Sequence, residues 1–476
     1  MKAASIAALL SLTLAGCAVG PDFERPAVPV TSAQAFVERP PAELASADAA
    51  AERWWQLFDD PVLDRLVVRA LERNSDVRVA TANLARARAA LREVRTQRFP
   101  STDISAQYSR QRAGVQPGVP NQTQAFEFDS FAVGFDAAYE VDLFGRVSRS
   151  VEAARADAEA ARFDLGAARI AIAAETARTY AQLCNFAEQV ALTRETLALQ
   201  QQILDLTQRQ FSAGRGTRRD VARIELLTSQ LEAQVPQLEA ERRASLYALA
   251  TLTGDAPAAA DEAASQCLTT PRVARAIPVG DAASLLARRP DVARAERQLA
   301  ADTARIGVAT ADLYPSIRLL GSVGLNAAEI GDLGDAASQS FSLGPLISWS
   351  FPNISAARAR IAQARAQTDA SLAGFDGAVL LALQEAEQAF ARYAGSVERN
   401  IALRRAEAAS ETVATLTRAR RDAGSDSFLD LLDAERSRAE ARLARAQSEG
   451  AVAEAQVALF KALGGGWESD PEESKR

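Results

Sequence analysis

Two stretches that contain no proline and read almost entirely as helix constrain the fold of this chain most strongly. They are residues 146–213 and 355–423, which are 68 and 69 residues long. At about 1.5 Å per residue, each would form a rod of roughly 100 Å, too long for a compact domain. Each stretch ends at a glycine, Gly214 or Gly424, after which a second helical stretch begins. The sequence therefore predicts an elongated, mainly helical unit that occurs twice.

A short segment of alternating apolar and polar residues precedes each long helix. In residues 131–143 every odd position is apolar, whereas the even positions include Gly134, Asp136, Glu140 and Asp142. A period of two sustained for thirteen residues is typical of a strand with one apolar face. The predicted strands are at about 100–112 and 129–144 in the first copy, and at about 315–326 and 340–351 in the second.

Recurring short motifs support the duplication. Asp76-Val77 recurs as Asp291-Val292, an offset of 215, and Ala213-Gly214 recurs as Ala423-Gly424, an offset of 210. The predicted segments are a signal peptide at 1–16, a lipidated extended arm at 17–60, repeats at 61–270 and 271–466, and a tail at 467–476. Helices are expected at 61–97 (61–72 and 75–97), 146–213, 217–254, 281–313, 355–423 and 427–463. A kink is expected near Pro236, inside one of these helices.

The composition excludes several kinds of chemistry. The chain has no histidine and its only methionine is Met1, which removes His-based triads, His metal sites and Met-lined metal sites. No nucleotide loop, nucleophile elbow or metal signature is recognisable, so we expect neither an enzyme nor a cofactor. The formal charge is −7 and no basic patch with interleaved aromatics occurs, which argues against nucleic acid as a partner.

The first seventeen residues read as a secretory signal, with Lys2 followed by an apolar core. Leu14-Ala15-Gly16-Cys17 resembles the bacterial lipobox, in which the cysteine receives a diacylglycerol and, after cleavage, an N-acyl chain such as palmitate. Ala18 replaces the aspartate that retains such lipoproteins in the inner membrane, which favours the outer membrane. An ordinary signal peptide with a chance cysteine is the alternative.

No later stretch has the 18 or more apolar residues of a spanning helix, so further membrane contact would come from strands. Four strands cannot close a barrel, because the smallest closed barrels need about eight. Three chains would supply twelve. The expected fold class is therefore mainly α with a membrane β-barrel, built from a duplicated strand-pair and long-helix unit.

Two further cysteines, Cys184 and Cys267, are expected at a similar height along the helices. Cys184 lies about 45 Å before the Gly214 turn, and Cys267 follows a return helix of about 55 Å. A disulfide between them and two separate buried thiols both fit the sequence.

Several motifs, in order and at the right spacing, resemble those of the TolC-like outer-membrane efflux proteins, closest to the OprM-like and NodT-like lipoprotein branch. Besides the lipobox, they are Trp54-Trp55-Gln56-Leu57-Phe58, Asp60-Pro61, Glu140-Val141-Asp142-Leu143-Phe144-Gly145-Arg146, Arg288-Arg289-Pro290-Asp291-Val292 and Asp312-Leu313-Tyr314-Pro315-Ser316.

The resemblance implies a homotrimer whose twelve-stranded barrel in the outer membrane continues into a helical tunnel through the periplasm. The tunnel would dock, at the tips near Gly214 and Gly424, a periplasmic adaptor and an inner-membrane pump of the RND type. The expected function is the exit duct of a tripartite efflux system that expels small toxic compounds. A duct for type I protein secretion and a periplasmic scaffold lipoprotein without a pore are the alternatives, and the exported compound is not readable from the sequence.

The resemblance also implies a gate, since the segment 424–433 looks like the family's entrance segment. Carried over by position, Asp430 and Asp433 ring the constriction and Asp220 helps to latch neighbouring helices. Asp426 departs from the pattern, because TolC-like members often carry arginine there. Independently, acids at i and i+3 share one helix face, and three copies would gather six negative charges that favour cations.

Overall fold

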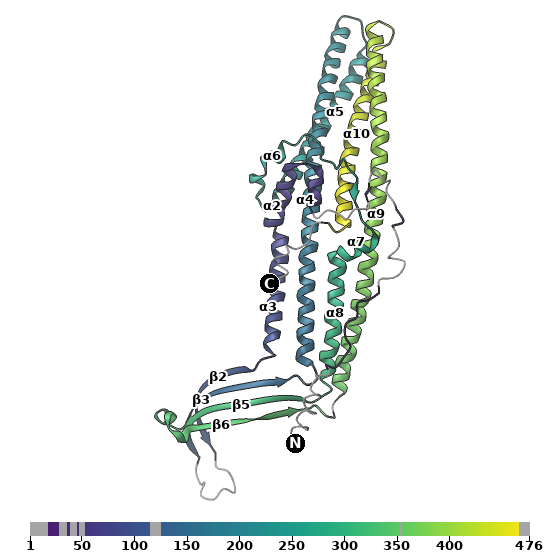
Figure 1. The fold of residues 1–476 in the computed structure, drawn as a ribbon. Coiled ribbons are helices and arrows are strands. Elements are labelled where there is room, and N and C mark those ends of the chain that lie inside the picture. Colours follow the sequence, from purple (N-terminus) through teal and green to yellow (C-terminus); the bar gives the residue numbers. More distant parts are fainter. Residues whose placement is uncertain are drawn as a thin grey trace. The chain divides into compact units, whose positions relative to one another are not determined.

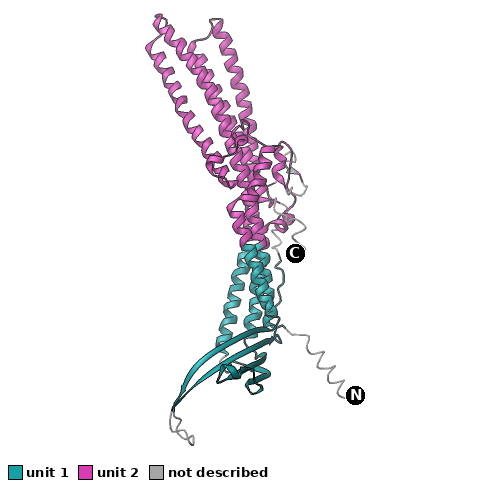
Figure 2. Ribbon diagram, turned by 90° about the vertical axis from the view of Figure 1, so that its left-hand side faces the viewer, with its two compact units in different colours: residues 1–26, 83–161, 295–375 teal, residues 27–82, 162–294, 376–476 magenta. Residues whose placement is uncertain are grey.

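The computed structural model describes residues 18–27, 36–38, 45–46, 53–114, 125–352 and 354–465. The predicted signal peptide, Cys17 and the tail 467–476 lie outside these ranges. The chain forms two compact units, each assembled from three separate segments (Figure 2). Unit 1 comprises residues 1–26, 83–161 and 295–375, and unit 2 comprises 27–82, 162–294 and 376–476.

The elements follow the order expected of a duplicated unit (Figure 1). The first copy contains α2 (Pro61–Arg73), α3 (Ser75–Thr96), β2 (Ser101–Ala113), β3 (Phe126–Val141), α4 (Arg146–Ser212) and α5 (Arg218–Leu252). The second contains α7 (Ala282–Arg288), α8 (Pro290–Ala311), β5 (Ser316–Ala327), β6 (Gln339–Ser348), α9 (Ser355–Asp422) and α10 (Phe428–Ala462). Shorter elements are β1 (Ala45–Ser46), η2 (Trp54–Phe58), η3 (Pro257–Ala259), α6 (Glu262–Ser265), β4 (Ile277–Pro278), η4 (Ile330–Gly334) and η5 (Ala336–Ser338).

The four long strands of unit 1 form one antiparallel sheet in the order β2-β3-β5-β6. The central pairing of β3 with β5 joins the two copies. In register, Ile104, Phe135, Val323 and Phe341 form one cross-strand row, and Asp103, Asp136, Ser322 and Ser342 form the adjacent row. Because adjacent rows face opposite sides of a sheet, one face is apolar and the other is polar.

Strand β3 ends at Val141, three residues before the predicted end at 144. The cause is Asp142, whose carboxylate accepts hydrogen bonds from the backbone N–H groups of Val147 (2.9 Å) and Ser148 (2.8 Å). These N–H groups have no partner within the first turn of α4, so Asp142 caps the helix and does not continue the strand. Gly145, with φ of +79°, makes the turn between the two elements.

The predicted helical segment 281–313 contains two helices in the structure, α7 and α8. Arg289 separates them in an extended conformation, with φ −69° and ψ 119°. The following residue is Pro290, which disfavours helical geometry at the residue before it and suits the first turn of a new helix. Helix α5, by contrast, continues from Arg218 to Leu252 through Pro236, where the sequence predicted a kink.

The core of unit 2 lies where η2 meets α5 and α10, the helices that return from the turns at Gly214 and Gly424. Trp54 is fully buried and stacks on Phe460 of α10, with ring centroids 4.9 Å apart. Asp60 caps α2 by accepting hydrogen bonds from the backbone of Val62 (2.8 Å) and Leu63 (3.1 Å). The tryptophan motif near the start of the folded chain is therefore a packing motif.

None of the helices in the described ranges combines the length and apolar character needed to cross a lipid bilayer.

Candidate functional site

The candidate site is the pair of helix tips in unit 2, where α4 turns into α5 and α9 turns into α10. Gly214 and Gly424 take positive φ values of +72° and +79°. In both turns the residue after the glycine donates its N–H to a carbonyl five residues back: Arg215 to Gln210 (2.9 Å) and Ser425 to Arg420 (2.8 Å). This is the pattern of a glycine-terminated helix, and glycine tolerates its backbone without strain.

Each return helix begins with a capping box, a reciprocal pair of hydrogen bonds between the first cap residue and the residue three positions later. In α5, Thr217 N–H donates to Asp220 (3.2 Å) and Asp220 N–H donates to the Thr217 hydroxyl (3.3 Å). In α10, Ser427 and Asp430 make the same two bonds at 3.0 Å and 3.2 Å. Asp220 and Asp430 are thus equivalent residues of the two copies, 210 positions apart.

Sequence analysis missed this equivalence, although the Thr217-x-x-Asp220 and Ser427-x-x-Asp430 spacings signal it. The capping bonds also fix the charge of both carboxylates. Hydrogen bonds from Ser427, chiefly from its hydroxyl, lower the pKa of Asp430. The Thr217 hydroxyl likewise lowers the pKa of Asp220. Both groups are therefore ionised at neutral pH.

Asp433 lies one turn beyond Asp430 and has a different partner. Its Oδ1 is 2.8 Å from Nη2 of Arg436, a pairing that sequence analysis did not predict although the i, i+3 spacing allows it. Asp430 and Asp433 line the same hollow of about 320 Å³ between α9 and α10. Asp220 does not line it. The structure thus brings together the two acids assigned to the constriction and leaves the proposed latch residue on the other tip.

Asp426, the residue that departs from the family pattern, is engaged within its own turn. Its carboxylate is 2.8 Å from Nε of Arg420, the residue whose carbonyl closes the glycine turn. The neighbouring Arg421 lies over the Phe428 ring, 5.0 Å from its centroid. These contacts tie the end of α9 to the start of α10.

Cys184 of α4 and Cys267, which follows α6, are joined by a disulfide with Cα atoms 5.1 Å apart. Polar contacts hold the same loop to α4. Thr270 accepts a hydrogen bond from Asn185 (3.1 Å) and donates one to Glu188 (3.1 Å). The segment that follows α6 is therefore fastened to the long helix at several points.

A charged cluster around Arg445 of α10 was not anticipated from the sequence. Its guanidinium lies within 3.2 Å of carboxylate oxygens of Glu188, Glu407 and Glu449. Glu449 in turn contacts Arg404 at 2.5 Å. The cluster links α4, α9 and α10. Only the i, i+4 spacing of Arg445 and Glu449 could have been read in advance, because the other partners are far apart in sequence.

The lipidation residue Cys17 lies outside the described residues, but the residues after it are placed in unit 1. Val19 N–H donates to the carbonyl of Phe144 (3.2 Å), at the junction between β3 and α4. Arg149, almost completely buried, is 2.7 Å from the carboxylate of Asp22. Among the described residues, no group of three or more Asp, Glu or Cys side chains could hold a metal ion.

Comparisons with known proteins agree with the duplicated architecture of the chain. The family model of the outer membrane efflux proteins matches residues 66–255 and 282–465, one segment in each copy. The chain is 33% identical to the outer membrane protein OprJ of Pseudomonas aeruginosa over 97% of this chain and 95% of that protein. It is 31% identical to the solvent efflux pump outer membrane protein SrpC of Pseudomonas putida, over 98% of this chain and 99% of SrpC. Nodulation protein T of Rhizobium leguminosarum bv. trifolii is 31% identical over 96% of both chains.

Solved structures give the same result. The outer-membrane channel OprN superimposes with a TM-score of 0.87 at 37% identity, covering 95% of this chain and all of that chain. The open state of the MtrE outer membrane channel of Neisseria gonorrhoeae gives a TM-score of 0.81 at 30% identity, over 95% of this chain and 99% of that one. The duplicated helices, the antiparallel sheet with strands from both repeats and these matches lead to one assignment: the chain belongs to the outer membrane efflux protein family.

Proposed function

We propose that three copies of this chain form the outer-membrane exit channel of a tripartite efflux pump. The observation that carries the proposal is the sheet of unit 1, which exposes an apolar face. Phe341 and Leu343 of β6 are each 85% exposed, and Ile104 of β2 is 80% exposed. Hydrocarbon side chains exposed in this way across four strands fit contact with lipid better than contact with water.

The opposite face of the same sheet is polar, as expected for the lining of a water-filled channel. Its rows include Asp103, Asp136 and Ser322, and the Ser322 and Ser342 hydroxyls are 2.8 Å apart. Strands β2 and β6 each have one unpaired edge in the described sheet. Three copies joined edge to edge would give a closed barrel of twelve strands without unpaired edges.

A scaffold lipoprotein without a pore would leave the apolar face in water, so the sheet favours the channel. The relatives are named for efflux pumps of solvents, toluene and antibiotics, which supports the export of small toxic compounds here. A periplasmic adaptor and an inner-membrane pump of the RND type would dock at the tips near Gly214 and Gly424. Acyl chains on Cys17 would add an anchor, and the seating of Val19 beside Phe144 would hold that anchor near the sheet.

Asp430 and Asp433 are proposed to form the cation-favouring constriction of the closed channel. Their shared hollow and the ionised state of Asp430 support this role. Asp220, as the equivalent residue of the other tip, has the same cap chemistry and is proposed to order the start of α5 at the interface with a neighbouring copy.

A matched pair of substitutions tests the orientation of the sheet. Leu343→Arg places a charge near the middle of the apolar face, where an arginine facing lipid costs about 2–4 kcal/mol. Ser342→Arg places the same charge one residue away on the polar face. We expect the Leu343 variant to lose heat-resistant trimers in isolated outer membranes and the Ser342 variant to keep them. Equal effects of the two substitutions would contradict the proposal.

A further inference from the structure

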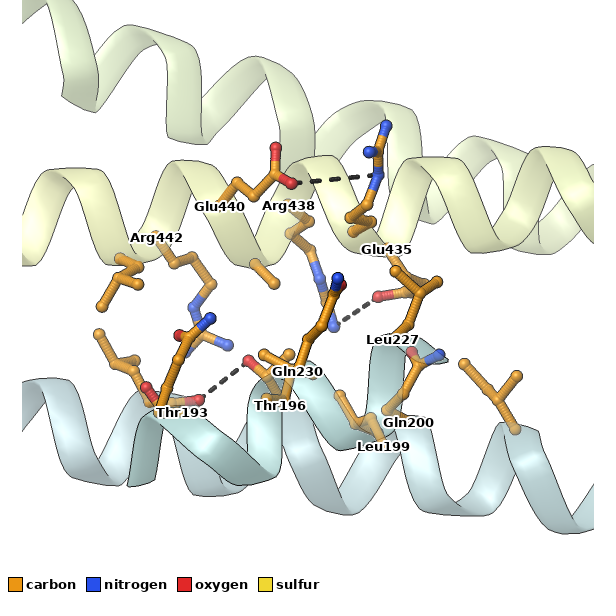
Figure 3. A pocket seen from close by; sticks show the side chains of 17 residues that line it. Thr193, Thr196, Leu199, Gln200, Leu227, Gln230, Glu435, Arg438, Glu440 and Arg442 are labelled. Atoms are coloured by element: carbon orange, nitrogen blue, oxygen red, sulfur yellow. Dashed lines mark hydrogen bonds and ion pairs between the residues drawn. The ribbon is translucent and has the colours of Figure 1, made fainter. Parts of the chain in front are cut away.

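A cavity in unit 2 has no role in the function proposed above. It has a volume of about 210 Å³, is partly open to solvent, and lies between α4, α5 and α10 (Figure 3). Its apolar walls come from all three helices: Leu192, Leu199, Ile203, Leu227, Leu231 and Leu443. Asp220, Asp430 and Asp433 do not line it. The walls therefore offer a binding place for an apolar molecule, separate from the hollow that Asp430 and Asp433 line.

One buried polar group at this cavity lacks a partner. Gln200 of α4 is 9% exposed, and its Nε2 makes no hydrogen bond among the described residues. Gln456 shows how a buried glutamine is normally satisfied, since it accepts from Val273 N–H (3.0 Å) and donates to the Val273 carbonyl (2.9 Å). A buried donor without an acceptor is unfavourable. Gln200, drawn in Figure 3, lines the cavity, but its Nε2 is covered in the structure. A turn of the amide would bring this donor to an acceptor in the cavity.

The charged residues of the lining are already paired. Arg442 binds Glu195 at 2.9 Å, and Arg438 binds Glu435 at 2.8 Å. Arg436 is 4.0 Å from Glu440, and both ends of this longer pair are more than half exposed. A charged ligand would have to compete with these partners, whereas a neutral one would leave them intact. The lining therefore favours a neutral ligand.

We propose that this cavity is a binding site for a small neutral molecule with an apolar body and one hydrogen-bond acceptor, held by Nε2 of Gln200. An apolar cavity of about 150 Å³ holds benzene, so the volume here suits an aromatic ring with a short substituent. The binding itself does not depend on the proposed channel function.

A consequence for gating does rest on the proposed function. Helix α10 contributes residues 435, 436, 438–440, 442 and 443 to the cavity, beginning two residues after Asp433. A ligand that fits the cavity favours conformations in which α10 keeps its present distance from α4 and α5. It should therefore change the fraction of time for which the channel is open.

Two probes that differ by one group test the binding site. Acetophenone carries a carbonyl acceptor, and α-methylstyrene replaces that oxygen with a CH₂ group of similar shape. Binding is measured by ligand-observed NMR on the assembled protein in lipid nanodiscs, with empty nanodiscs subtracted. Leu227→Trp fills the cavity, and Leu226→Trp is its matched control, because Leu226 is 57% exposed on the same helix and does not line the cavity. Gln200→Leu removes the amide group and keeps a side chain of similar size.

We expect acetophenone to bind the native protein about five- to tenfold more tightly than α-methylstyrene, the usual effect of one hydrogen bond. Gln200→Leu should abolish that preference, Leu227→Trp should abolish binding of both probes, and Leu226→Trp should change neither. Binding no greater than to empty nanodiscs, which would leave water as the only occupant, would overturn the proposal. So would equal affinity of the native protein for the two probes. If Leu227→Trp fails to assemble, the Gln200→Leu comparison decides alone. Unchanged channel currents despite specific binding would refute only the gating consequence.

Discussion

The pairing of Asp433 with Arg436 sets the charge that the proposed gate would carry. Each chain of the proposed trimer contributes the carboxylates of Asp430 and Asp433 and the guanidinium of Arg436, which lies 2.8 Å from Asp433. The bonds from Ser427 lower the pKa of Asp430, so this carboxylate is charged at neutral pH. Asp433 and Arg436 are counted with their formal charges of −1 and +1. The sum of the three charges is −2 + 1 = −1 per copy, or −3 for three copies rather than −6 for the carboxylates alone.

Substitutions should change this charge in known steps. Arg436→Gln gives −2 per copy and −6 for three, and Asp433→Asn gives 0. Asp430→Asn combined with Asp433→Asn gives +1 per copy and +3 for three. Because fixed negative charge concentrates cations and repels anions, cation preference should fall in the order Arg436→Gln, native protein, Asp433→Asn, double variant. Replacing both acids with alanine should also raise conductance, because the constriction loses their side chains.

The assay is the reversal potential of single channels in planar bilayers under a KCl gradient. Salt near 0.1 M keeps the screening length at about 10 Å, so the side-chain charges remain visible to passing ions. Asp205→Asn is the control, because it removes an exposed acid paired with Arg209 on α4, away from the hollow. An exposed pair such as Asp433–Arg436 contributes about 0.5 kcal/mol or less, so the variants should assemble normally. Reversal potentials that do not follow the predicted order would refute the gate assignment.

Three further predictions concern stability. Replacing both Cys184 and Cys267 by serine should lower the free energy of unfolding by about 4.5 kcal/mol on the chain-entropy model, since the bond closes a loop with a separation of 83 residues. A denaturant curve unchanged from that of the native protein would contradict this prediction. Burial alone would raise the pKa of Asp302, but hydrogen bonds from Ser371 and Arg305 outweigh burial and lower it. Ionised Asp302 therefore stabilises the fold at pH values above the pKa of an unfolded aspartate. This stabilisation is lost as the pH falls through the lower pKa of the folded state. The melting temperature of Asp302→Asn should therefore lie below that of the native protein at pH 6 and approach it near pH 3; a constant gap would show the reasoning to be wrong. Trp54→Ala should cost about 3–5 kcal/mol, because Trp54 is fully buried against Phe460, and a loss below about 1 kcal/mol in thermal unfolding would refute that role.

Local patterns in the sequence were enough to predict the long helices and the four long strands. Each of the signals can be read from neighbouring residues alone. They are the glycines at 214 and 424, the absence of proline from the long helices, and the period of two near Tyr139. The resemblance to the family's entrance segment, taken position by position, predicted that Asp430 and Asp433 lie at the same helix tip. Their place in a capping box was also readable, since Ser427 and Asp430 have the required spacing.

Features that depend on distant partners could not be predicted in this way. Arg445 meets Glu188 across 257 positions, and the periodicity of either helix does not indicate the other. The pairing of β3 with β5 likewise depends on contact between the two copies. The cavity beside Gln200 exists because three helices leave a space between them, which has no signature in any one helix. Even the end of β3 was misplaced, because Asp142 could serve either the strand or the cap of α4.

The number of chains in the assembled channel is the most direct test of the account, because the free edges of β2 and β6 are paired only if several chains share one barrel. Native mass spectrometry of the detergent-extracted protein, combined with single-channel recording of the same preparation, measures both the assembly and the pore. We predict three copies of the chain and discrete cation-preferring currents. A water-soluble monomer that produces no currents would contradict the account.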